Sequence, residues 1–90
     1  SEGDGTGLRM SVTGVRSYAD YAAIVSWLEG LELIQSANVE QVQQDRIELR
    51  LMAQAQAAQL ASIIELNTRL LPVPIAGSEM AAQLSYQWQN

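Results

Sequence analysis

A five-residue run in which apolar and charged residues alternate constrains this chain most. The run is Ile47-Glu48-Leu49-Arg50-Leu51. Successive side chains of a β-strand point to opposite faces of the sheet, so a period of two predicts a half-buried strand, extending here to about Ala53. The three apolar residues would face a core, and the two charged residues would face water or a neighbouring strand.

Three further segments carry strand patterns. Residues 8–15 alternate cleanly and predict a first strand. Residues 31–42 predict a second strand whose phase breaks at Val42, and a β-bulge near Glu40-Gln41 would restore it. Residues 82–88 alternate again and predict the final strand.

Two segments carry helical patterns. Ser17 is a good N-cap, and Asp20 three residues later suits the positive end of a helix. Gly30 fits the left-handed position that ends many helices. Residues 54–66, rich in Ala and Gln, predict a second helix. The apolar stripe expected on the first helix consists of Tyr21, Ile24, Val25 and Leu28.

Turns and boundaries follow from glycine, proline and polar residues. Gly14 marks the exit of the first strand, where a β-bulge or a close approach of the backbone to another segment is expected. Residues 43–46 form the expected hairpin turn, with Asp45 as the candidate for an unusual backbone angle. Residues 70–75 contain two prolines and would be an extended or short edge piece. We interpret residues 1–7 as a disordered tail or linker and residues 8–90 as one domain.

The expected order is strand, helix, strand, strand, helix, strand. This order predicts an α+β fold, a ferredoxin-like βαββαβ two-layer sandwich with a four-stranded antiparallel sheet and two helices on one face. The spatial order would be fourth, first, third, second strand, which leaves the second and fourth at the edges. The uncovered face would be polar and would carry Arg9, Ser11, Thr13, Glu48, Arg50, Gln83, Ser85 and Gln87.

Charge and hydropathy exclude two classes of partner. The net charge is −5 and the five basic residues, all Arg, are scattered, whereas nucleic acids require a basic surface. Tyr86 and Trp88 could stack on a base, but their phase matches Leu84, so we expect them in the core. No apolar run approaches the length of a membrane span, so we expect no membrane insertion by this domain.

Side chains suited to catalysis are scarce. The chain has no Cys and no His, and Ser17 therefore lacks the usual base for a nucleophile. An acid–base pair of carboxylates requires a desolvated pocket, whereas the acidic residues lie in predicted surface turns. We therefore predict no enzyme, no catalytic residue, no metal site and no cofactor. The acidic residues considered were Glu29, Glu32, Glu40, Asp45 and Glu48.

Three segments resemble one known family. They are residues 14–21 (Gly-Val-Arg-Ser-Tyr-Ala-Asp-Tyr), residues 70–73 (Leu-Leu-Pro-Val) and residues 84–88 (Leu-Ser-Tyr-Gln-Trp). Together they resemble the C-terminal domain of the DUF2066 family of bacterial proteins of unknown function. The resemblance implies a fragment of an exported protein of the periplasm or cell envelope. It transfers no site residue, and Gln87 stands where the family often has a basic residue.

The remaining hypothesis is interaction. An open sheet edge can pair with another chain, and the second strand has neither proline nor lysine to prevent this. We predict a non-enzymatic protein-interaction or structural domain of an envelope protein, whose partner is an envelope-associated protein or a second copy joined as a homodimer. The alternative is a dimeric regulatory module that binds a small molecule, by analogy of fold. The expected contact edge consists of Leu33, Gln35, Ala37 and Val39.

Overall fold

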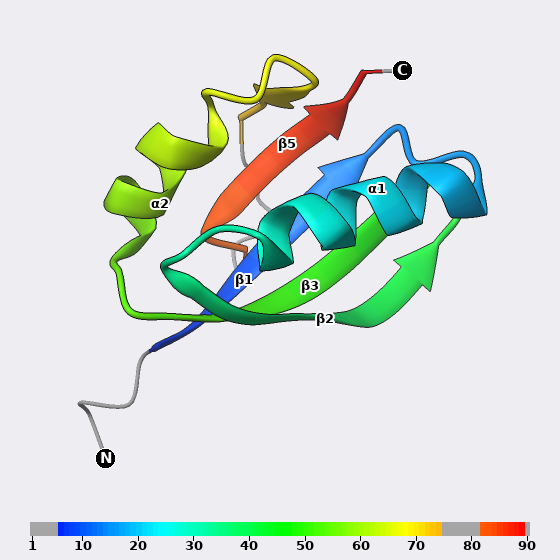
Figure 1. Ribbon diagram of the computed structural model, residues 1–90. Helices are drawn as coiled ribbons and strands as arrows, with labels where there is room; N and C mark the ends of the chain where they lie inside the picture. The colour runs from blue at the N-terminus through cyan, green and yellow to red at the C-terminus, as the bar shows by residue number, and fades with distance from the viewer. Residues whose placement is uncertain (1–5, 75–81, 90) are drawn as a thin grey trace.

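The computed structural model describes residues 6–74 and 82–89. Within them the chain forms a mixed sheet and two helices (Figure 1). The helices are α1 (Tyr18–Glu29) and α2 (Ala57–Ile64). The five strands are β1 (Thr6–Thr13), β2 (Ile34–Gln43), β3 (Arg46–Ala53), β4 (Leu70–Pro72) and β5 (Leu84–Trp88). The first two residues of β1 belong to the segment that was predicted as a tail.

The strands lie in the order β2-β3-β1-β5-β4. The α+β class is confirmed, and the four predicted strands keep their predicted order. The sheet nevertheless has five strands rather than four, and β1 pairs with β5 in parallel rather than antiparallel. The physical reason is β4, which pairs antiparallel with β5. This added strand reverses the chain once more between α2 and β5, and it also moves the edge of the sheet from β5 to β4.

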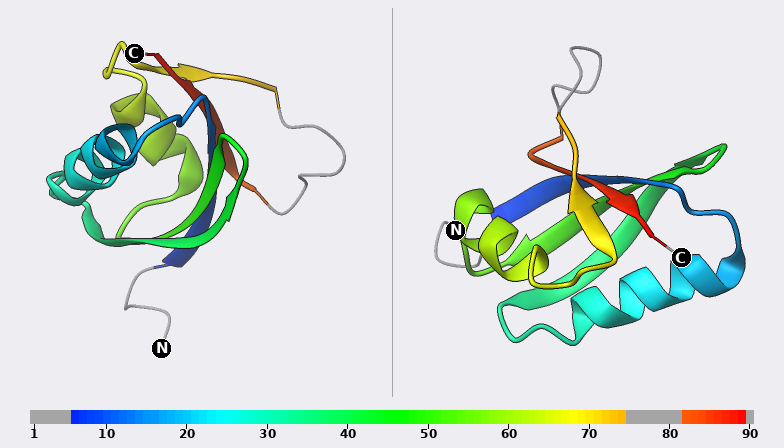
Figure 2. Two further views of the ribbon diagram at one scale, coloured as in Figure 1. Left: turned by 90° about the vertical axis from the view of Figure 1, so that its right-hand side faces the viewer. Right: turned by 90° about the horizontal axis from the view of Figure 1, so that it is seen from above.

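Both helices lie on the same face of the sheet (Figure 2). The core between the layers is built from the alternating residues of β1 and β3 and from one side of each helix. Tyr86 and Trp88 lie in this core, as their phase predicted, and Trp27 packs at its margin. The core-facing residues of the two helices are Ile24, Leu28, Leu60 and Ile64.

The start of α1 is as predicted, but its end is not. The Ser17 hydroxyl accepts a hydrogen bond from the backbone N–H of Asp20 at 3.1 Å. Gly30 follows the helix with φ −80° and ψ −10°, so the left-handed conformation predicted for it is wrong. The final turn closes instead through the N–H of Gly30, which donates to the carbonyls of Ser26 and Trp27. No positive φ is needed for this closure.

The second helix is shorter than the predicted range of residues 54–66. Gln56 is still extended, with φ −85° and ψ 163°, so helical geometry starts at Ala57. The N–H of Gln54 donates to the carbonyl of Leu33 at 3.0 Å. This bond joins the residue after β3 to the residue before β2, and the helix begins three residues later, at Ala57.

Two of the three predictions for the β2–β3 hairpin are confirmed, and the third is wrong. A register shift lies between Val39 and Gln41, which confirms the predicted bulge and places Val42 opposite Ile47. The turn falls at residues 44–45, as expected. The residue with positive φ is Gln44 at 56°, not Asp45. Because Gln43 pairs with Arg46, the loop has two residues, and its first residue takes the positive angle.

Of the two alternatives predicted at Gly14, a bulge and a close backbone approach, the structure shows the close approach. Its φ is +82°, and a Cβ atom there would lie 2.8 Å from the backbone oxygen of Trp88. A side chain at this position would therefore strain the backbone and push β1 away from β5.

We expect Gly14→Ala to lower the free energy of unfolding by about 2 kcal/mol or more, because backbone strain and a steric clash act together. Gly30→Ala is the matched control. A Cβ atom at Gly30 would lie 3.4 Å from its nearest neighbour, and the backbone φ is negative, so this variant should stay within about 1 kcal/mol of wild type. Urea denaturation measures both, and equal effects of the two substitutions would contradict the assignment.

Candidate functional site

Strand β2 lies at one edge of the sheet, where the predicted contact residues were placed. Among the described strands it has β3 as its single neighbour. Gln35 is exposed at a first register shift, Ala37 is buried, and Val39 is half-buried. Leu33 lies before the strand, and its carbonyl accepts from Gln54. The structure therefore brings three of the four predicted residues onto the edge and leaves Leu33 outside it.

The backbone of β2 offers hydrogen-bonding groups on its outer side. The N–H of Ala37 donates to Oε2 of Glu29, at the end of α1, over 3.4 Å. This N–H therefore points away from β3. Strand alternation gives the backbone of Val39 the same outward direction. A bond of 3.4 Å is near the limit for a hydrogen bond, so Glu29 covers this donor only weakly.

One flank of α1 runs beside this edge. It is defined by Tyr18, Tyr21, Ala22, Val25 and Glu29, which recur at helical spacing. Glu29 contacts Ala37 at one end of the flank, and the tyrosines share a pocket with Val42 of β2 at the other end. The flank therefore meets β2 near Ala37 and near Val42, and its members Tyr21 and Val25 also pack against the core.

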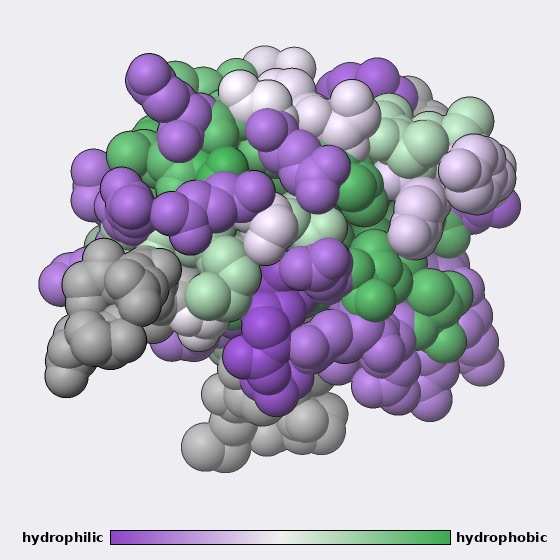
Figure 3. Space-filling view, turned by 60° about the horizontal axis from the view of Figure 1, so that its bottom comes forward, coloured by the Kyte–Doolittle hydropathy of each residue, from purple (hydrophilic) through white to green (hydrophobic). Residues whose placement is uncertain are grey.

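The surface between α1 and β2 is hollowed and partly apolar. A pocket of about 280 Å³ is lined by Tyr18, Tyr21, Val42 and their neighbours. A second pocket of about 420 Å³ is lined by residues of α1 and by Gly30, without a residue of β2. Tyr18 is 81% exposed and Val42 is 63% exposed, and the Tyr18 ring stacks on Tyr21 with 5.7 Å between centroids. In the view from the underside, apolar residues gather beside polar ones on this side of the molecule (Figure 3).

The sequence did not reveal this flank as a surface. Tyr21 and Val25 fit the predicted core stripe of the helix, and both are only half-buried. The width of the apolar stripe on the helix could have shown that these two residues are not fully buried. Tyr18, Ala22 and Val25 extend the apolar residues beyond what one core-facing side of a helix requires.

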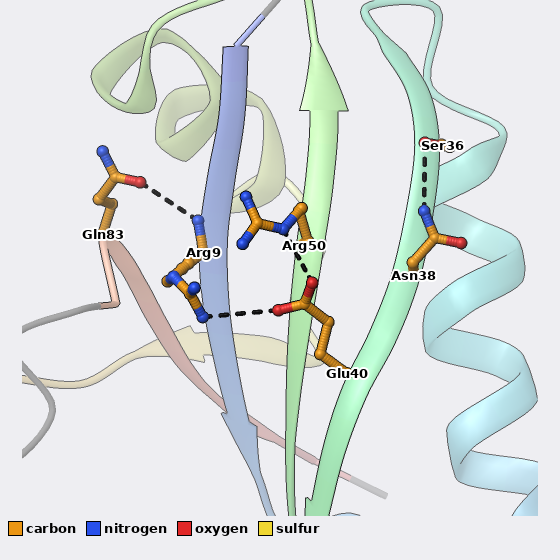
Figure 4. Close-up of polar contacts among 6 residues, drawn as sticks. All are labelled: Arg9, Ser36, Asn38, Glu40, Arg50 and Gln83. Atoms are coloured by element: carbon orange, nitrogen blue, oxygen red, sulfur yellow. Dashed lines mark hydrogen bonds and ion pairs between the residues drawn. The ribbon is translucent and has the colours of Figure 1, made fainter.

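The uncovered face of the sheet carries a cluster of three charged residues (Figure 4). Arg9 of β1 and Arg50 of β3 stand directly opposite each other, which places two like charges together. Glu40, projecting from the bulge in β2, accepts from Nε of Arg50 at 2.8 Å and from Nη1 of Arg9 at 3.5 Å. The hydrogen bond from Arg50 is the main cause that lowers the pKa of the Glu40 carboxyl. The carboxylate of Glu40, placed by the bulge, therefore offsets the repulsion between the two arginines.

The same face contains two buried serines. Ser11 is 2% exposed and Ser85 is 8% exposed, and they stand opposite each other in the parallel pairing of β1 with β5. The Ser11 hydroxyl has no hydrogen-bond partner among the described residues. The predicted polar face is therefore polar in composition but is not solvated throughout.

The acidic residues considered for catalysis do not converge. Glu40 is committed to the two arginines, and Glu48 lies 3.5 Å from Arg46. Tyr86 donates to Glu65 at 3.2 Å, and burial is the main cause that raises the pKa of its phenol. It therefore stays protonated at neutral pH. Within residues 6–74 and 82–89, no group of three or more acidic side chains is placed to hold a metal ion.

Comparisons with protein-family models, with curated proteins and with solved structures find no match to this chain. Neither described helix has the length and apolar content that a bilayer crossing requires.

The Glu40 cluster generates a prediction about pH. Because the folded-state pKa of Glu40 is lowered, its ionised form stabilises the fold above the ordinary value of 4.5, and this contribution is lost as pH falls through the folded-state pKa. Glu40→Gln should therefore be less stable than wild type at neutral pH, and the difference should shrink below pH 4.5 and also in high salt. Urea denaturation across this pH range measures it. A difference that does not change with pH would contradict the assignment.

Proposed function

We propose that this chain is a non-enzymatic protein-interaction or structural domain that binds through the outer edge of β2. The observation that carries the proposal is an edge strand of ten residues, in which the N–H of Ala37 is directed outward and donates to Glu29 over 3.4 Å. An extended segment of another chain can add to such an edge, with main-chain hydrogen bonds for affinity and side-chain pockets for specificity. The hollowed surface beside α1 would provide those pockets.

We further propose the setting in which this edge acts. The resemblance to the C-terminal domain of the DUF2066 family supports an exported bacterial protein of the periplasm or cell envelope, with an envelope-associated partner. We regard the fold as a variant of the ferredoxin-like sandwich. In this variant β3, α2 and β4 form the second crossover, and β5 is inserted between β1 and β4.

Ala37→Pro tests the edge, because proline removes the outward N–H and places a ring there. That N–H donates to Glu29 and not to β3, so the pairing of β2 with β3 should survive. We expect the tagged domain to capture a specific protein from a bacterial envelope extract, read by mass spectrometry, and we expect the proline variant to lose that protein.

Ala37→Gly is the matched control, since it alters the same position and keeps the donor. Circular dichroism and thermal unfolding would establish that both variants are folded. Capture that is unchanged in a folded Ala37→Pro domain would rule out the β2 edge as the contact.

A further inference from the structure

We propose that the chain seated on the β2 edge is a second copy of this protein, related by a two-fold axis. The inference rests on the proposed function, because it names the partner of the same edge. In the dimer, β2 would run antiparallel to β2 of the partner subunit, and the two sheets would continue into one. Each α1 would lie antiparallel to the partner's α1 on the same face.

The backbone permits this pairing at little cost. A two-fold axis across the edge makes the two β2 strands antiparallel, so their outward N–H and C=O groups face each other. The N–H of Ala37 would exchange its long bond to Glu29 for a carbonyl of the partner subunit. The donor remains satisfied throughout, and Glu29 is released.

The flank of α1 explains why a copy of this chain fits better than an isolated strand. A bare peptide strand would cover the edge but would leave the exposed Tyr18 and the half-buried Tyr21 and Val25 in contact with water. A second α1 would cover Tyr18, Tyr21 and Val25 with the same residues of the partner. Ala22 of the flank and Ser26, which lines the same pocket, have small side chains that allow two helices to approach closely.

Charge fixes the antiparallel orientation. Arg16 is exposed and lines the same pocket as Val42, at the C-terminal end of β2, whereas Glu29 lies toward the N-terminal half of that strand. An antiparallel arrangement therefore brings Arg16 toward the partner's Glu29, and the two-fold axis repeats the pair. A parallel arrangement would instead place like charges beside each other at both ends. Complementary charges of this kind select orientation more than they add affinity.

Sedimentation equilibrium of the purified domain over a wide range of concentrations tests the proposal. We expect a reversible monomer–dimer equilibrium in wild type. Tyr18→Ala alters a side chain that is 81% exposed, so it should fold normally and weaken the dimer. Arg16→Glu should raise the dimer Kd by about tenfold or more, and Arg16→Glu combined with Glu29→Arg should restore much of the loss.

Arg69→Glu is the matched control, because it makes the same change in net charge next to β4, at the other edge of the sheet. It should leave the dimer Kd unchanged. A wild type that stays monomeric at every concentration overturns the dimer, while the capture experiment with Ala37→Pro still decides the edge proposal. A dimer insensitive to Tyr18→Ala and Arg16→Glu also overturns the inference, because it would use another surface.

Discussion

The central position of β1 is the constraint on which the rest of this structure depends. The strand pairs with β3 on one side and β5 on the other, so both of its backbone edges are satisfied within the sheet. Its inward residues Leu8, Met10 and Val12 are buried almost completely. Gly14 ends the strand in a conformation that lets the chain pass close to the backbone of Trp88. With β1 in the middle, β2 and β4 are the two edges of the sheet that the described residues form.

The elements predicted correctly are those in which one residue pattern decides the outcome. Alternation at Ile47, Leu49 and Leu51 is sufficient because a strand in any other register would expose all three. The N-cap at Ser17 likewise depends on one hydrogen bond between groups three residues apart, the Ser17 hydroxyl and the Asp20 N–H. The bulge near Glu40 could be read from the phase of Val42. In each case the alternative local structure would expose apolar side chains or leave a backbone N–H without a partner, which costs free energy at that position.

The parts that sequence reasoning missed are decided by partners distant in the chain. β4 lies within residues 70–75, where a short edge piece was predicted, but its three residues are too few to show a period and did not reveal that they pair with β5. Whether β5 would join β1 in parallel depends on that short strand, and so no pattern within residues 84–88 could reveal it. The edge at Ala37 and Val39 was predictable because it needs only strand order. The flank of α1 was not, since apolar spacing on a helix gives the width of a stripe but not which element covers each side.

The two edges of the sheet differ in how they are protected against pairing with other chains. The edge strand β4 has three residues and ends in proline, and Arg69 just before it lies 4.2 Å from the centre of the Trp88 ring. A short strand with proline is an ordinary protection. Strand β2 is ten residues long, has no proline, and directs its one charged side chain, Glu40, onto the open face of the sheet. The two register shifts in β2 protect this edge in part, and the partner proposed above would cover the edge together with the flank of α1.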